Sequence, residues 1–346
     1  MMATTLPHPP ISPGVGARRK GPKSLPTLPL SAFSPPNTGL SDSFPLPQSP
    51  STVHPDRVVD ASVRGSILEW KKQTNGPLAG RVSAVVVKAG ENELEGLESH
   101  ASQAGVTVMA VSVPFSLESG TIPSVPSTKY PITFTTSFKD TSDAASTALR
   151  VALSVGHVVE IDVQETGEAS WEGVEDLLTK ATTGGISSGL VVLSNVLPPP
   201  HNLDLPIVKL LSHPTYQSYQ SHIATLSLFP RVYLSYVPPS WNAPTPSTPH
   251  DGQEGATASK EKKEWKRRIK MYLGPAVEAF GFERILFGSA PSPSSSASSS
   301  AGDWYELARE AFAELGVDQE SVDAVFGGNA ERSLCGVECK RLKEYL

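Results

Sequence analysis

The chain has 346 residues, which is long enough for two average domains or for one large α/β barrel. Its net charge of −6 at pH 7 offers no basic face for phosphate groups, so neither nucleic acid nor an anionic membrane is expected as a partner. No apolar run approaches the roughly 20 residues of a membrane span, and we expect a cytoplasmic protein. Import into mitochondria is less favoured, because the early prolines would break the amphipathic helix of a transit peptide.

Proline dominates the first part of the chain. Positions 1–50 contain 12 of the 32 prolines and one acidic residue, Asp42. Proline lacks the backbone N–H that helices and central strands require, so we predict a disordered Pro-rich arm over residues 1–55. The segments "LPHPPISP" and "FSPPN" are typical of polyproline II ligands for aromatic grooves. A Pro-rich-motif-binding partner for the arm is therefore one alternative for how the protein acts.

Eight short runs rich in β-branched residues follow the arm, and segments with helical spacing fill most of the intervals between them. The runs lie at 58–63, 82–88, 106–113, 132–138, 158–163, 190–195, 232–237 and 284–289. Eight strands that alternate with helices predict an α/β fold, a (β/α)8 TIM barrel over residues 56–346. A doubly wound open sheet is the alternative, but it usually has fewer strands and a Gly-rich phosphate loop after the first one.

Two segments interrupt the alternation of strands and helices. Residues of about 238–262 are rich in Pro, Ser, Thr and Gly, and residues 291–302 contain the low-complexity run "PSPSSSASSSAG". Both follow a strand and so emerge on the carboxyl-terminal face of the predicted barrel, where barrel enzymes keep their active sites. We predict flexible loops at both places, which argues against catalytic groups held rigidly there.

The last 70 residues carry a recognisable series of motifs, and weaker ones precede it in the chain. "FGFERILFGS" at 280–289 is followed by "GNAER" at 328–332, and "VVDASVRG", "LVVLSNVLPPP" and "LSLFPRVYLSYV" precede them in order. Over roughly residues 56–336 this series resembles the amidohydrolase-related family of metal-dependent TIM-barrel hydrolases. The resemblance implies an amidohydrolase-like barrel in which zinc or another divalent metal activates water to cleave a C–N or C–O bond in a small molecule.

The positions that carry the family's chemistry hold other residues in this chain. Ser62 and Arg64 stand where the resemblance implies two histidines on the first strand, Ser194 and Asn195 where it implies an Asp-His pair, and Ala290 where it implies the last-strand aspartate. Arginine cannot lose its proton to bind a cation, and alanine supplies no general base. We therefore expect no metal cofactor and a catalytically degenerate homologue that acts in binding or scaffolding. The alternative is an active lactone or amide hydrolase whose site is relocated or independent of metal.

Strand alternation predicts which polar residues enter the barrel. On the fifth strand, Glu160 and Asp162 alternate with an apolar set that should face the helices. On the first strand, the same logic places Asp60, Ser62 and Arg64 inside.

Buried charges need partners, so we predict that Arg64 meets Asp162 or Glu160 across the barrel as a salt-bridged plug. Alternatively, Arg64, Lys88 and Asn195 form a pocket for a small anionic ligand.

Four of the five histidines after the fourth predicted strand have spacings that can be compared with those of a metal-ligand pair. His157, His201, His213 and His222 lack both the i, i+2 strand spacing and the i, i+4 helix spacing of paired metal ligands. We predict surface or helix-capping roles for them.

Overall fold

The computed structural model describes residues 49–74, 76–90, 94, 96–122, 128–183, 188–201, 203–248 and 256–334, with the side chains of 256–258 excepted. Most of the predicted Pro-rich arm and about a third of the 238–262 loop lie outside these described residues. All of these residues belong to the compact unit that begins at Pro47. Across its described residues, no helix combines the length and the apolar character needed to cross a membrane.

Eight parallel strands form one sheet whose spatial order equals the chain order, β1 to β8. The strands are β1 (Val58–Arg64), β2 (Val82–Lys88), β3 (Thr107–Pro114), β4 (Ile132–Phe138), β5 (Val158–Val163), β6 (Leu190–Leu197), β7 (Val232–Tyr236) and β8 (Ile285–Phe287). Every neighbouring pair is parallel, and beyond β8 the chain returns to the edge of β1. The predicted TIM barrel is confirmed, and all eight strands lie where their β-branched runs predict them.

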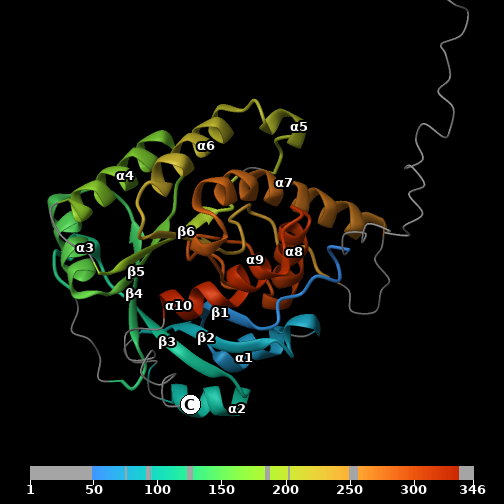
Figure 1. The fold of residues 1–346 in the computed structure, drawn as a ribbon, viewed down its shortest axis with the longest axis horizontal. Helices are drawn as coiled ribbons and strands as arrows, with labels where there is room; N and C mark the ends of the chain where they lie inside the picture. Colours follow the sequence, from blue (N-terminus) through green and yellow to red (C-terminus); the bar gives the residue numbers. More distant parts are fainter. Residues whose placement is uncertain are drawn as a thin grey trace, which may run out of the picture. The chain divides into compact units, whose positions relative to one another are not determined.

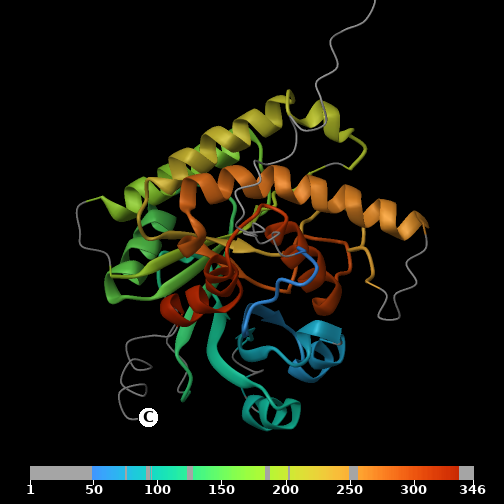
Figure 2. The same ribbon diagram turned by 45° about the vertical axis from the view of Figure 1, so that its right-hand side comes forward.

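Helices cover the outside of this sheet (Figure 1). They are α1 (Ile67–Gln73), α2 (Leu97–Ala104), α3 (Asp143–Val155), α4 (Glu168–Thr182), α5 (Ile207–Leu210), α6 (Pro214–Ser227), α7 (Ala256–Phe280), α8 (Ala301–Ala313), α9 (Gln319–Asp323) and α10 (Asn329–Ser333). Figures 1 and 2 show α4, α6 and α7 side by side. The described part of the β3–β4 connection contains a 3-10 turn at Leu117–Ser119.

Two apolar layers follow from the strand pattern. The residues on the outer face of β5, Val159, Ile161 and Val163, belong to the large core between sheet and helices. A second cluster fills the barrel interior, with the end of α10 closing it: Val59, Ala61, Val86, Met109, Ala110, Leu190, Val192, Leu286, Ala330 and Leu334. The interior below the mouth is therefore a packed core, as in other small parallel barrels.

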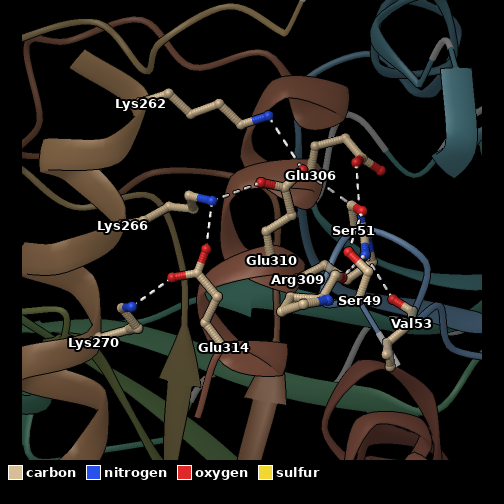
Figure 3. A network of polar contacts seen from close by, with 11 residues as sticks. Ser49, Ser51, Val53, Lys262, Lys266, Lys270, Glu306, Arg309, Glu310 and Glu314 are labelled. Atoms are coloured by element: carbon tan, nitrogen blue, oxygen red, sulfur yellow. Dashed lines mark hydrogen bonds and ion pairs between the residues drawn. The ribbon is translucent and has the colours of Figure 1, made fainter. Parts of the chain in front are cut away.

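The basic run on α7 is paired with the acidic face of α8 (Figure 3). Lys262, Lys266 and Lys270 recur every fourth residue, so they share one face of the helix. Lys262 and Lys266 approach Glu310 at 3.2 and 3.0 Å, and Glu314 bonds both Lys266 and Lys270. These lysines therefore serve helix packing.

Arg309 of α8 attaches the entering chain to the barrel, as Figure 3 also shows. Its guanidinium donates to the carbonyl oxygens of Pro50 and Val53 at 2.9 and 2.6 Å, and to Glu306 at 2.7 Å. The predicted arm extends to residue 55, but its last residues make these contacts. The packed part of the chain thus starts before residue 56.

The seam between β8 and β1 depends on a close backbone approach and a buried carboxylate. A Cβ on Gly288 would lie 2.7 Å from the Cβ of Ser62, so only glycine fits there. The backbone N–H of Ala290 donates to Ser62 O at 2.8 Å. Asp60, fully buried, accepts from the backbone N–H of Ser289 at 2.9 Å and from that of Ser62 at 3.1 Å.

The other oxygen of Asp60 accepts from the indole N–H of Trp70 on α1 at 2.9 Å. Burial raises the pKa of the Asp60 carboxyl, and the hydrogen bonds from Ser289, Ser62 and Trp70 oppose that rise. One side chain thus joins the last strand, the first strand and the first helix.

Replacement of Asp60 by alanine tests this bridge. Asp60→Ala leaves the buried backbone N–H groups of Ser62 and Ser289 without an acceptor, while the Trp70 indole N–H keeps Ser289 Oγ at 3.1 Å. Each lost acceptor costs about 1–3 kcal/mol, so we expect the free energy of unfolding to fall by roughly 2 kcal/mol or more. Urea unfolding followed by circular dichroism measures the change. The exposed Glu172→Ala on α4 is the control and should stay within about 0.5 kcal/mol of wild type. A loss equal to that of the control would contradict the proposed bridge.

Candidate functional site

A pocket of about 390 Å³ opens at the carboxyl-terminal ends of β1 to β5. Arg64, Lys88 and Asp162 supply its charged groups, and Ser112 is among its hydroxyl groups. Phe115 contributes to its apolar wall. This is the face on which TIM-barrel proteins place their sites, and we call it the mouth pocket.

Lys88 and Glu160 form the ion pair of the barrel mouth. The Lys88 ammonium lies 2.6 Å from a Glu160 carboxylate oxygen, and their side chains are 9% and 11% exposed. The strand alternation correctly places Glu160 inside the barrel. The predicted partner was wrong, because the cation that meets Glu160 is Lys88 of β2 and not Arg64.

Arg64 lies at the last position of β1 and is exposed to solvent within the mouth pocket. Among the described residues no carboxylate lies within ion-pair distance of it. Its backbone is the register partner of Lys88, and Lys88 is in turn the register partner of Ser112. Three polar side chains therefore start from one row across β1, β2 and β3.

The first strand does not alternate as predicted. Asp60 faces α1 and the β8 seam, and the interior cluster takes Val59 and Ala61 instead. The ladder between β1 and β2 shifts register between Asp60 and Val63. Such a bulge changes which face the later residues occupy, and this explains why simple alternation assigned the first part of β1 to the wrong face.

Asp162 is the second carboxylate of the mouth and is 3% exposed. Its Oδ2 accepts from Ser292 Oγ at 3.0 Å, whereas its Oδ1 is buried and has no hydrogen-bond partner among the described residues. Burial raises the pKa of Asp162 to about 6. The Ser292 hydrogen bond and the charges of Lys88 and Arg64 lower this pKa, and Glu160 raises it.

Ser292 was not among the residues expected at the site. It lies in the low-complexity segment after β8, yet it is 3% exposed and also bonds Ser294 Oγ at 2.7 Å. The composition of the segment therefore does not prevent this serine from packing, and the flexibility of the loop as a whole stays a prediction. The feature of the sequence that points to Ser292 is its position, because the segment directly follows the end of a predicted strand and so lies at the barrel mouth.

Asn195 is in the mouth region but not in the pocket. Its side-chain amide donates to Val163 O at 2.9 Å, and its carbonyl accepts from Ser240 Oγ at 2.9 Å. The residue is fully buried, with φ of 62°. It joins the ends of β5 and β6 to the loop after β7, so the described contacts give it a structural role.

The residues at the ligand positions that the sequence resemblance implies do not fit a zinc ion. Ser62 and Ser194 are neutral hydroxyls, Arg64 carries a fixed positive charge, and Ala290 has no donor atom. Both polar ends of Asn195 are already hydrogen-bonded. Within the described part of the chain no group of three His, Cys, Asp or Glu side chains has the arrangement of a metal site.

The histidines on the helical layer have structural partners. His213 caps α6 and accepts from the Thr215 backbone N–H, as predicted. The predicted surface or capping role is wrong for His222, which is buried. Its two ring nitrogens lie 2.6 Å from Glu175 and 3.1 Å from Glu168, and its ring stacks on Trp171.

Two further histidines also lie outside the mouth pocket. His201 accepts from Arg268 at 2.9 Å, because an arginine can only donate. Burial, then the charges of Arg268 and His213, lower the pKa of His201 to about 4. His157 packs edge-on against Phe134, and burial lowers its pKa.

Comparison with known proteins identifies the fold. Two crystal structures of an amidohydrolase from Burkholderia multivorans, one with bound zinc and one with bound HEPES, each match with a TM-score of 0.52 at 16% sequence identity. Each match covers 80% of this chain and 99% of the other. No protein-family model and no curated protein matches the chain. The barrel fold that the sequence resemblance implies is thus confirmed, and these neighbours are amidohydrolases.

The raised pKa of Asp162 predicts a pH dependence of stability. A carboxyl group whose pKa is higher in the folded state stabilises that state below its unfolded pKa, and this contribution is lost as the pH rises through the folded value. Since the pKa goes from 3.8 to about 6, wild type should lose about 2 kcal/mol relative to Asp162→Asn between pH 4 and pH 7.

Urea unfolding of both proteins across this pH range measures the difference. Glu172→Gln, an exposed substitution that removes one carboxylate, serves as the control for charge. A difference between wild type and Asp162→Asn that does not change with pH would contradict the assignment.

Proposed function

We propose that this amidohydrolase-like barrel binds a small anionic molecule in the mouth pocket without the metal chemistry of its structural neighbours. The observation that carries the proposal is the state of the two pocket cations. Lys88 is neutralised by Glu160 at 2.6 Å, whereas Arg64 lines the same pocket and has no ion-pair partner among the described residues. A carboxylate ligand would supply that partner.

The chemistry of Arg64 suits this role. A guanidinium presents its donors in a planar fork that matches a carboxylate in a bidentate geometry. Phe115 and Pro293 give the pocket apolar walls for a short carbon skeleton. The substituted ligand positions, above all Arg64 and Ala290, support binding as the function in preference to metal-assisted hydrolysis.

Substitution of Arg64 tests the proposal directly. We expect isothermal titration calorimetry with a panel of small mono- and dicarboxylates to detect binding to wild type, unchanged by a chelator. Arg64→Gln should weaken it at least tenfold, because a hydrogen bond to a charged group contributes about 1.5–3 kcal/mol. The exposed Arg267→Gln on α7 removes the same charge away from the pocket and should leave affinity unchanged. Wild-type protein that binds no carboxylate would refute the proposal.

A metal-independent hydrolase is the second candidate, and Asp162 favours it. A carboxylate whose pKa is about 6 is well matched to take a proton from water near neutral pH. This function predicts turnover of lactones or amides with a rate that rises through pH 6, and a loss of about 100-fold or more in Asp162→Asn. Absence of turnover in wild type at every pH would leave binding as the function.

The arm's partner is a separate proposal. Its Pro-rich segments lie outside the described residues, and a partner with an aromatic groove would recognise them without involving the barrel. Deletion of residues 1–48 separates the two functions, because ligand binding in the mouth pocket should survive it.

A further inference from the structure

The charges of the barrel mouth cancel while Asp162 is ionised. Arg64, Lys88 and Asp162 line the mouth pocket, and Glu160 holds Lys88 at 2.6 Å. Two cations therefore stand beside two carboxylates, and the four groups together carry no net charge. Protonation of one carboxylate would leave a single positive charge at the place where an anion is expected to bind.

Asp162 is the carboxylate placed to take up that proton. Glu160 is committed to the ammonium of Lys88, whereas Asp162 is buried and has no ion-pair partner among the described residues. Burial raises the pKa of Asp162 to about 6, so this group changes its charge close to neutral pH. The described residues that line the mouth pocket include no histidine, the other side chain that titrates in this range.

The hydrogen bond from Ser292 suits both charge states of Asp162. Ser292 Oγ donates to Asp162 Oδ2 at 3.0 Å, lies 2.7 Å from Ser294 Oγ and accepts from the Ser294 backbone N–H at 3.2 Å. When Asp162 is ionised, the hydroxyl donates to it and accepts from Ser294 Oγ. When Asp162 is protonated, the hydroxyl accepts from it and donates to Ser294 Oγ, because a hydroxyl has one donor and two lone pairs.

The same two hydroxyls connect the buried carboxyl group with solvent, since Ser294 is exposed. Ser292 passes its proton to Asp162 and receives one from Ser294, and Ser294 recovers a proton from the solvent. Each hydroxyl ends as it began, and the net change is one proton gained by Asp162. The carboxyl group can therefore change its charge without direct access from the pocket.

We infer that the mouth pocket takes up an anion together with a proton, which converts the Asp162 carboxylate to the neutral acid while the anion occupies Arg64. The inference rests on the proposed function and adds the regulation of that site. One negative charge enters the pocket and one is neutralised, so the balance of charge is restored. A protonated carboxyl group supplies no base, and the coupling therefore belongs to binding and not to hydrolysis.

The coupling acts through charge and needs no contact between the anion and Asp162. The ladder partners of Asp162 on β4 and β6 are uncharged, Ser137 and Ser194. The charged groups that act on it come from β1, β2 and β5 itself: Arg64, Lys88 and Glu160. A bound anion adds a like charge, which favours the neutral acid. By linkage, protonation of Asp162 then strengthens anion binding by the same factor.

Anion affinity should therefore fall as the pH rises. Below the pH at which Asp162 ionises in the free protein, the favourable charge is already present; above it, binding requires uptake of a proton. The full chain is titrated by calorimetry between pH 5 and pH 8 with pyruvate, dichloroacetate and trifluoroacetate, which stay ionised throughout. We expect affinity to fall about tenfold, because two like charges in one small pocket interact this strongly.

The proton itself can be counted. Calorimetry in buffers of different ionisation enthalpy should show uptake of about half a proton for each anion bound near pH 6.5. Arg64→Gln should weaken all three probes at every pH, as the proposed function requires.

Two variants assign the proton to Asp162. Asp162→Asn is neutral at every pH, so it should keep the affinity that wild type reaches at pH 5, vary less than about twofold up to pH 8 and take up no proton. Ser292→Ala removes a hydrogen bond that favours the carboxylate, so the midpoint of the pH dependence should move to higher pH. Glu172→Gln removes an exposed carboxylate on α4 and should behave as wild type. Circular dichroism at each pH confirms that the variants are folded.

The possible results separate the inference from the proposed function. Affinity that does not change with pH, without proton uptake, overturns the inference while the anion pocket stands. A pH dependence that survives in Asp162→Asn, a midpoint that Ser292→Ala does not move, or loss of binding in folded Asp162→Asn also overturns it. No binding of any probe at pH 5 refutes the anion pocket and the inference together.

Discussion

Closure of the barrel between β8 and β1 is the constraint on which the mouth depends. Parallel strands cannot close unless the last strand reaches the first, and here the contact is so close that Gly288 has no room for a Cβ. Asp60 supplies acceptors for backbone N–H groups on both strands and for Trp70 of α1. This seam holds in place the end of β1, which carries Arg64, and the segment after β8, which contains Ser292. The geometry of the mouth pocket therefore depends on the buried carboxylate of Asp60.

Charge balance in the mouth follows from that geometry. Two cations and two carboxylates lie within one small region, and only Lys88 and Glu160 form an ion pair. Arg64 keeps contact with solvent, which reduces the cost of leaving it without an ion partner. Asp162, in contrast, is buried. Desolvation raises its pKa, and the hydrogen bond from Ser292 and the charges of Lys88 and Arg64 offset only part of that rise.

The sequence predicts the barrel well because its signals are local. Each strand coincides with its own run of β-branched residues. Polar and apolar residues alternate along β5 without interruption, so the pattern correctly predicts that Glu160 and Asp162 lie inside the barrel. The first strand fails because a register shift between Asp60 and Val63 is a property of the ladder with β2 and has no mark in the residues themselves. The partner of Glu160 depends on which of two cations at adjacent strand ends reaches it. Ser292 was missed because a serine-rich composition conceals one buried residue among exposed ones.

The two proposed functions share a positively charged group at the barrel mouth and differ from metal-assisted chemistry in how water could be activated. A divalent metal would place positive charge at the strand ends and activate water. In this chain Arg64 supplies positive charge at the same face, but a guanidinium does not activate water as a metal ion does. An anion can still be attracted and oriented by such a site. Bond cleavage would require a base from the protein, and within the mouth pocket the buried carboxylate of Asp162 is the group whose pKa suits that task. The two proposed functions therefore differ in whether Asp162 takes a proton from an attacking water once an anion is bound.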